Sequence, residues 1–243
     1  MTTTIPAAAP EAVRSRLALA LDTDDLIAAT RLARDVAPWF GIAKVGLELF
    51  SAAGPEAIGA MRELGYDVFV DLKFHDIPTT VAKAARVVGS LGATYLTIHT
   101  SGGEAMVRAG VEGFAEGAAA AGLPAPIALG VTVLTSDPHA TGHELRHRIG
   151  VAIEAGCAGL VCSALDVREA HLLAPRLVTV VPGIRPSGAA HDDQARVATP
   201  GDAIRAGAGV LVVGRAVTGS ADRIAAAGSI AAEVAVALTA TSA

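Results

Sequence analysis

Short apolar runs alternate with longer segments of helical spacing from Arg16 to near the end of the chain. Eight runs have strand character and lie at Leu17–Asp22, Ala43–Leu47, Asp67–Lys73, Tyr95–His99, Ile127–Leu134, Leu160–Ser163, Val178–Val181 and Val210–Gly214. The segments between them are rich in alanine and arginine, and their spacing predicts helices that include Asp24–Val36, Pro55–Leu64, Thr79–Leu91, Gly103–Ala121, His143–Ala155 and Ala221–Leu238. Eight strand and helix units in about 250 residues predict an α/β fold, the closed (β/α)8 or TIM barrel.

The alternative architecture is an open, doubly wound parallel sheet. Its usual GxGxxG fingerprint after the first strand is missing, so the barrel is the favoured prediction. No linker rich in proline, glycine or serine divides the chain, and we expect a single catalytic domain over residues 15–243. Residues 1–14 are rich in threonine, alanine and proline and predict a loose N-terminal arm.

Charge and cysteine content restrict the partners and the compartment. The chain has 24 acidic and 19 basic side chains and a formal charge of −5, so no overall positive field attracts nucleic acid or an anionic membrane. Residues 1–15 lack the basic start and the continuous apolar core that are typical of a secretory signal, and no later run reaches about 18 uninterrupted apolar residues. Cys157 and Cys162 match neither a disulfide framework nor a paired zinc motif. These features predict a cytoplasmic protein.

In a barrel of this kind, the chemistry lies at the carboxyl ends of the strands. Most of the predicted strands carry a polar residue there, namely Asp22, Lys44, Asp71, Lys73, His99, Thr135, Ser136, Arg185 and Arg215. Because side chains alternate along a strand, Asp71 and Lys73 should point to the same face. Ala18 and Ala20 share a face with Asp22, which predicts a pocket with a small-residue floor.

Three carboxylates and two ammoniums could meet at this mouth: Asp22, Lys44, Asp71, Lys73 and Asp76. Alternating signs favour the ionised form of each group, since an opposite charge within about 4–6 Å offsets desolvation. A solvated ion-pair network at the rim is the structural alternative. The chain has only three lysines, and two of them fall in this cluster, which favours a functional site.

The end of the chain predicts a phosphate site. Arg215 follows Gly214 after the last strand, and loops after strands seven and eight bind phosphate in many barrels; an ordinary turn is the alternative. The polar stretch from Arg185 to Arg196 is longer than the usual connection of about 2–6 residues. We expect it to be a lid carrying Gln194, the alternative being a disordered surface loop.

Other motifs are interpreted as structural. The pair His143 and His147 matches HExxH, but it opens a helix away from the rim and lacks a third ligand, so a surface helix face is expected instead of zinc. His75 and His99 lie near the rim and are left out of the catalytic set. Trp39 and Phe40 precede the second strand and are expected to pack in the core.

Six segments in order resemble the orotidine 5'-phosphate decarboxylase family. The signature runs from Val70 to Thr80, Val-Asp-Leu-Lys-Phe-His-Asp-Ile-Pro-Thr-Thr. The other matching segments are Leu19–Asp22, Lys44–Gly46, Val131–Ser136, Val181–Pro186 with Asp192–Gln194, and Val213–Arg215. The resemblance implies decarboxylation of orotidine 5'-monophosphate to uridine 5'-monophosphate and CO2, the last step of de novo pyrimidine biosynthesis, without a cofactor or a metal.

The resemblance also implies individual roles. Asp22 would bind the ribose or the base, and Lys44 the ribose and its neighbouring carboxylate. Asp71 would lie against the substrate carboxylate, and Lys73 would protonate the carbon that loses CO2. The resemblance also implies that Thr135 and Ser136 bind the pyrimidine, and it does not decide which of the two makes the contact. Pro182 is a further implied substrate contact. The residues implied to bind the phosphate are Arg185, Gln194, Gly214 and Arg215. In an implied homodimer, Asp76 would reach the partner's pocket, with Ile77 and Thr80 lining the shared site.

The residue types suit this chemistry. Loss of CO2 leaves a carbanion, which a fixed ammonium can stabilise and protonate, as Lys73 could. Repulsion between Asp71 and the substrate carboxylate is a second contribution, ranked below carbanion stabilisation. Two rival functions remain: a metal-assisted decarboxylase or epimerase of sugar phosphates, with magnesium on Glu and Asp, and a silent barrel that binds nucleotide as a sensor.

Overall fold

A computed structural model describes residues 8–133, 141–186 and 198–241. Eight parallel strands pair in chain order, and β8 pairs with β1, so the sheet closes into a barrel. The strands are β1 (Leu17–Leu21), β2 (Ile42–Gly46), β3 (Asp67–Phe74), β4 (Tyr95–His99), β5 (Ile127–Val131), β6 (Gly159–Val161), β7 (Val178–Val181) and β8 (Val210–Val213). The predicted (β/α)8 barrel is confirmed.

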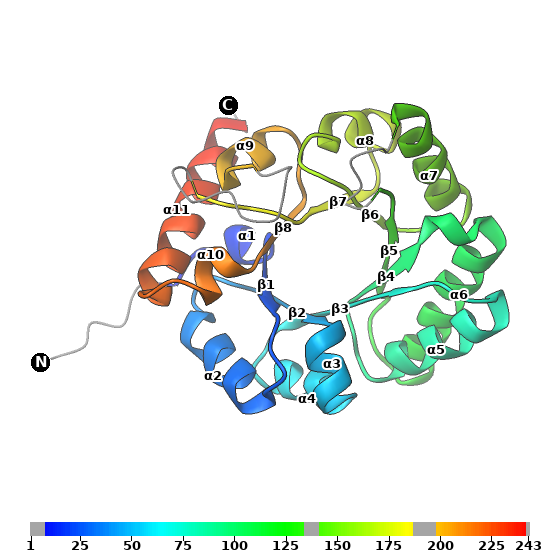
Figure 1. Cartoon of the computed structure of the whole chain (residues 1–243), viewed down its shortest axis with the longest axis horizontal. Helices are drawn as coiled ribbons and strands as arrows, with labels where there is room; N and C mark the ends of the chain where they lie inside the picture. The colour runs from blue at the N-terminus through cyan, green and yellow to red at the C-terminus, as the bar shows by residue number, and fades with distance from the viewer. Residues whose placement is uncertain (1–7, 134–140, 187–197, 242–243) are drawn as a thin grey trace, which may run out of the picture.

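Helices surround the strands on the outside (Figure 1). They are α1 (Glu11–Arg14), α2 (Leu26–Val36), α3 (Leu47–Ala53), α4 (Glu56–Glu63), α5 (Pro78–Ser90), α6 (Glu104–Ala120), α7 (Gly142–Glu154), α8 (Val167–Leu173), α9 (Pro200–Arg205), α10 (Arg215–Thr218) and α11 (Arg223–Thr241), with a 3-10 turn at Thr100–Gly102. The predicted helices are present with ends shifted by a few residues. The short helices α1, α3, α8, α9 and α10 were not among those named from the sequence.

Alternation along β1 separates two apolar layers. Leu17, Leu19 and Leu21 are fully buried in the large core between the strands and the helices. Ala18 and Ala20 belong to a second, smaller core inside the barrel, whose other buried members are Ile42, Phe69, Leu129, Val180, Val210 and Val212. The small alanine side chains leave room inside the barrel above this core, as the sequence predicts.

Strand β3 departs from regular pairing. Val70 pairs with Leu96 and Phe74 with Ile98, so three residues of β3 lie opposite one residue of β4. Lys73 lies in this bulge with a φ of 49°, the one non-glycine residue with positive φ in the described part of the chain. Bulges redirect side chains next to functional sites.

The packed part of the chain begins before residue 15. Helix α1 is formed by residues assigned to the expected loose arm, and Val13 is buried. The amide of Ala9 donates to the carbonyl of Pro38 at 2.8 Å. The predicted loose arm, residues 1–14, is therefore too long, because residues 8–14 belong to the packed part of the chain. Residues 1–7 lie outside the described residues.

Several smaller predictions concern buried residues. Trp39 and Phe40 are buried in the large core, as expected. Cys157 and Cys162 are free and buried, and burial raises the pKa of each thiol to about 12. Both thiols are therefore protonated at neutral pH.

Helix α11 is long and apolar enough, by length and composition, to cross a membrane over Arg223–Ala240. In the structure it packs against the barrel and contacts α1, α2, α9 and α10. Its buried residues recur at helical spacing and are Ala227, Ile230, Ala231, Val234 and Ala237. This pattern is typical of the outer helix of a globular barrel.

Candidate active site

A cavity of about 540 Å³ opens at the carboxyl ends of the strands. Its charged lining consists of Asp22, Lys44, Asp71, Lys73, Arg185 and Arg215. The apolar and small residues that line it are Ala20, Phe69, Val131, Val133, Val161, Cys162, Val180, Pro182, Gly183, Val212 and Gly214, together with Thr218. A cavity in which charged groups converge among apolar side chains is typical of a small-molecule site.

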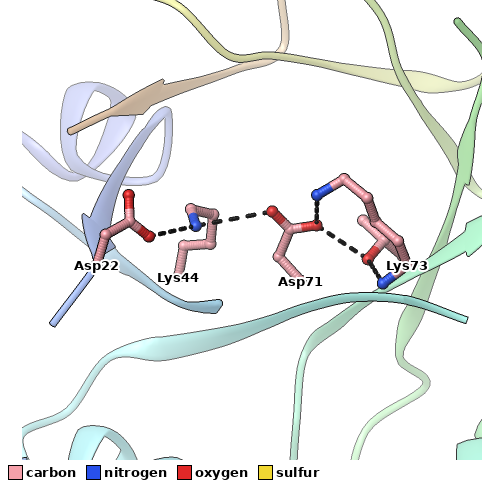
Figure 2. A network of polar contacts seen from close by, with 5 residues as sticks. Asp22, Lys44, Asp71 and Lys73 are labelled. Atoms are coloured by element: carbon pink, nitrogen blue, oxygen red, sulfur yellow. Dashed lines mark hydrogen bonds and ion pairs between the residues drawn. The ribbon is translucent and has the colours of Figure 1, made fainter. Parts of the chain in front are cut away.

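Four charged side chains from β2, β3 and the end of β1 form a row of alternating sign (Figure 2). Lys44 Nζ lies 3.1 Å from Asp22 Oδ1 and 3.7 Å from Asp71 Oδ2. Lys73 Nζ lies 2.8 Å from Asp71 Oδ1. The structure thus brings together the predicted cluster, with the exception of Asp76.

Asp71 is the carboxylate at the centre of the row. Its burial by itself raises the pKa, but the two flanking ammoniums of Lys44 and Lys73, with hydrogen bonds from Lys73 and Thr97, lower the pKa below its ordinary value. The carboxylate is therefore ionised at neutral pH. Lys44 is also buried, with 8% of its surface exposed, so the two central charges of the row, Lys44 and Asp71, lie largely out of water.

Gly46 lies next to the ion pair of Lys44 and Asp22, where a side chain would be too close. A Cβ atom built at this position would lie 3.0 Å from Lys44 Nζ and 3.3 Å from Asp22 Oδ1. Any other side chain would press on the ion pair that joins β1 to β2. The glycine at the end of β2 is therefore part of the site.

Thr97 is a site residue that the sequence reasoning missed. It lies in the middle of β4, and its hydroxyl contacts both Asp71 Oδ1, at 3.0 Å, and the backbone nitrogen of Lys73, at 2.9 Å. Alternation along β4 places Thr97 on the same face as Tyr95 and His99, which point into the barrel or toward its rim. The alternation of side chains along β4 is the feature of the sequence that could have identified Thr97.

Two arginines line the part of the cavity formed by β7 and β8. Arg185 follows β7, is 8% exposed, and donates from Nη1 to the carbonyl of Ile184 at 3.0 Å. Arg215 begins α10 directly after Gly214, and both line the cavity. Gly183 has a φ of 78°, a conformation that favours glycine, and turns the chain between Pro182 and Arg185. The predicted phosphate-binding residues of this region therefore share one cavity with the ion-pair row.

Asp76, Ile77 and Thr80 do not line the cavity of their own chain. All three are exposed, and Ile77 has 65% of its surface accessible. Asp76 Oδ1 accepts a hydrogen bond from the amide of Ile77 at 2.6 Å, just before Pro78 opens α5. Thr135, Ser136, Gln194 and most of the predicted lid lie outside the described residues.

The histidines take no direct part in the row. The rings of His75 and His99 lie 5.6 Å apart near the ends of β3 and β4. Burial, with the nearby charges of His75, Lys73 and Arg148, lowers the pKa of His99. His143 and His147 are exposed on α7, and no three His, Cys, Asp or Glu side chains group as a metal site within the described ranges.

Known proteins resemble this chain over most of its length. Residues 15–230 match the model of the orotidine 5'-phosphate decarboxylase / HUMPS family. The chain is 44% identical to an orotidine 5'-phosphate decarboxylase of Moorella thermoacetica, over 91% of this chain and 92% of the relative. It is 46% identical to one from Anaeromyxobacter sp. (strain K), over 89% and 97%.

A solved structure extends the likeness to the fold. The orotidine 5'-phosphate decarboxylase of Lactobacillus acidophilus superimposes with a TM-score of 0.77 at 32% identity, covering 90% of this chain and 99% of that one. Similarity in sequence and in fold thus points to one group of proteins. The chain belongs to the orotidine 5'-phosphate decarboxylase / HUMPS family.

Proposed function

We propose that this chain decarboxylates orotidine 5'-monophosphate to uridine 5'-monophosphate and CO2, with Lys73 as the proton donor and without a metal or prosthetic group. The observation that carries the proposal is the Lys73 ammonium held 2.8 Å from Asp71 inside the cavity. The names of the curated relatives and the membership in the family support the same reaction.

The reaction breaks the bond between the pyrimidine ring and its carboxylate carbon, and the electron pair stays on the ring carbon. The ammonium of Lys73 stabilises this developing negative charge and then donates a proton to the carbon. The valine and phenylalanine side chains in the cavity wall lower the polarity around the charges, and a charge interacts more strongly in such surroundings. Asp22 and Lys44 bind the ribose end of the substrate.

Asp71 has a second part in the proposal. Its carboxylate remains ionised beside the position of the substrate carboxylate, and repulsion between the two disappears when CO2 leaves. The same carboxylate orients the Lys73 ammonium through the contact at 2.8 Å. We rank stabilisation of the carbanion first and the relief of repulsion second.

The phosphate binds where β7 and β8 end. Arg185 and Arg215 supply positive charge there, and the backbone at Gly214 carries no side chain that would block an anion. Thr135, Ser136 and Gln194 are proposed to contact the pyrimidine and the phosphate, in line with the family resemblance. In this proposal the phosphate binds where β7 and β8 end, and the reacting carbon of the pyrimidine lies beside Lys73 on β3.

The working unit in this proposal is a cytoplasmic homodimer. Asp76, Ile77 and Thr80 are exposed and outside their own cavity, which supports a role in the cavity of a second copy. An exposed isoleucine next to a carboxylate is suited to an interface that buries the apolar residue and directs the charge into the partner's site.

Incubation of the purified protein with orotidine 5'-monophosphate tests the function. We expect release of CO2 and loss of substrate absorbance, both unchanged by a chelator. Activity that the chelator abolishes would favour a metal-assisted sugar-phosphate enzyme of the same barrel type. Binding of uridine 5'-monophosphate without any turnover of orotidine 5'-monophosphate would favour a nucleotide sensor.

A further inference from the structure

The irregular part of β3 lies opposite a single residue of β4. Between the pairs Val70 with Leu96 and Phe74 with Ile98, β3 has three residues and β4 has only Thr97. A ladder interrupted in this way leaves backbone groups that need other partners. The side chain of Thr97 is such a partner.

One hydroxyl makes both contacts. Thr97 Oγ1 lies 2.9 Å from the Lys73 backbone nitrogen and 3.0 Å from Asp71 Oδ1. A backbone N–H can only donate and an ionised carboxylate can only accept, so the hydroxyl accepts from Lys73 and donates its proton to Asp71. The direction of both hydrogen bonds is therefore determined by chemistry.

Because the surroundings of Thr97 are buried, its two hydrogen bonds restrain the positions of Lys73 and Asp71. Thr97 is fully buried, and the side chain of Asp71 is only 14% exposed, so water cannot replace either contact readily. Lys73 has a left-handed backbone, which persists in a non-glycine residue only where its neighbours hold it. The hydrogen bond to its N–H is one such restraint.

We infer that Thr97 is a positioning residue for the decarboxylation: its hydroxyl joins the Lys73 backbone to the Asp71 carboxylate and thereby sets the place of the Lys73 ammonium. The contacts form a closed circuit, because Lys73 Nζ returns to Asp71 Oδ1 at 2.8 Å. Thr97 thus acts through two other residues. The inference rests on the proposed function.

Three variants test the inference. Thr97→Val removes the hydroxyl at nearly constant volume, and Thr97→Ser keeps it. Thr179→Val is the matched control, because Thr179 is also a buried strand residue whose hydroxyl donates to the Gly207 carbonyl and accepts from the Gly209 amide, outside the cavity lining. Each variant is assayed with orotidine 5'-monophosphate for kcat and KM separately.

We expect Thr97→Val to lower kcat on the order of 10- to 100-fold with a change in KM of less than about 3-fold, because the ammonium is misplaced while the binding groups remain. Thr97→Ser should restore kcat to within about 3-fold of the parent, and Thr179→Val should leave it unchanged. Parent-like kcat in Thr97→Val, or an equal loss of kcat in Thr179→Val, would overturn the inference.

The pH profile gives a readout that loss of stability alone does not move. The Thr97 hydrogen bond, together with the charges of Lys44 and Lys73, lowers the pKa of Asp71. Its removal should shift the acid limb of the kcat profile to higher pH in Thr97→Val and leave the limb in place in Thr97→Ser. An unmoved limb in the valine variant counts against the inference.

Folding and function are separated by controls. Where Thr97→Val is insoluble, Thr97→Ala supplies the same comparison. If both Thr97 variants fail to fold while Thr179→Val folds, the hydroxyl has a purely structural role, and the inference is overturned. A parent protein that binds the nucleotide but releases no CO2 would contradict the proposed function itself. An active parent with an unaffected Thr97→Val contradicts only the role of Thr97.

Discussion

Lys73 Nζ lies 2.8 Å from Asp71 Oδ1 although the two residues come from the same strand and the backbone at Lys73 has a φ of 49°. In a regular strand, residues two apart are separated by about 6–7 Å and their side chains run parallel. The left-handed residue has a cost of about 1–2 kcal/mol. Here it directs a lysine toward a carboxylate two residues earlier.

Lys73→Ala should abolish the chemical step and leave substrate binding largely intact. The ammonium acts on charge that develops only in the transition state, so kcat should fall by about 1000-fold or more. Turnover under saturating substrate and the Kd of uridine 5'-monophosphate measure the two effects. Loss of nucleotide binding with unchanged kcat would contradict the assignment.

Arg215→Ala should have the opposite effect. A lost charge-assisted contact with the phosphate weakens binding and should raise KM about 10- to 100-fold, with a smaller change in kcat. The comparison with Lys73→Ala is made at saturating substrate. Equal residual turnover in the two variants would refute this division between the ends of the cavity.

Gly46→Ala should disturb the ion pair of Lys44 and Asp22. The added Cβ would lie 3.0 Å from the ammonium, so the pair must move, and we expect kcat/KM to fall about 10-fold. Gly59→Ala is the matched control, since a Cβ in that helix meets nothing within 4 Å. Equal activity of both variants would show that the row tolerates displacement.

The pKa of Asp71 predicts a pH-dependent contribution to stability. A carboxyl whose pKa is lowered in the folded state stabilises the fold above its ordinary pKa of 3.8, and that contribution is lost as the pH falls through the lower, folded value. At pH 7, Asp71→Asn should lower the free energy of unfolding by about 2 kcal/mol, since two ammoniums lose their shared partner.

Urea unfolding of the parent and of Asp71→Asn, followed from neutral pH into acid, measures this contribution. The difference in unfolding free energy between the two proteins should shrink as the pH drops below 3.8. The difference isolates Asp71 from the other carboxyl groups of the chain. A gap that stays constant into acid would show that the charge of Asp71 does not stabilise the fold.

Mixing two inactive variants tests the shared site. If Asp76 acts in the partner's cavity, a heterodimer of Lys73→Ala and Asp76→Asn has one intact site and one doubly altered site. An equal mixture that exchanges subunits should recover about one quarter of the parent activity. Each variant alone is the control, and the absence of any recovery in demonstrated heterodimers would place Asp76 in its own chain's site.

The eight alternating strand and helix segments were enough to predict the barrel, and the alternation of side chains along the strands predicted part of its cavity. It separated Ala18 and Ala20 from the leucines of β1, and it placed Lys44, Asp71 and Lys73 at one mouth. Strand ends were less predictable, because the final residue depends on pairing with a neighbour. Asp22, for example, lies just beyond the end of β1.

The bulge in β3 was beyond the reach of the sequence pattern. Nothing in a period-two pattern predicts that Lys73 adopts a left-handed backbone, because that conformation results from contacts with β4. For the same reason, Thr97 was overlooked in a strand with the composition of ordinary barrel core. Alternation along β4 could have placed Thr97 on the inner face of the barrel, but its two partners on β3 become visible only when the neighbouring strand is in place.

The pairing of β8 with β1 gives the cavity a further property. Asp22 follows the first strand and Arg215 follows the last, so the cavity is assembled from both extremes of the barrel's sequence. A nascent chain that has emerged only through β7 holds Lys44, Asp71 and Lys73 but lacks one wall of the site. Catalytic competence should therefore appear late in synthesis, in a single step, once the ring of strands is complete.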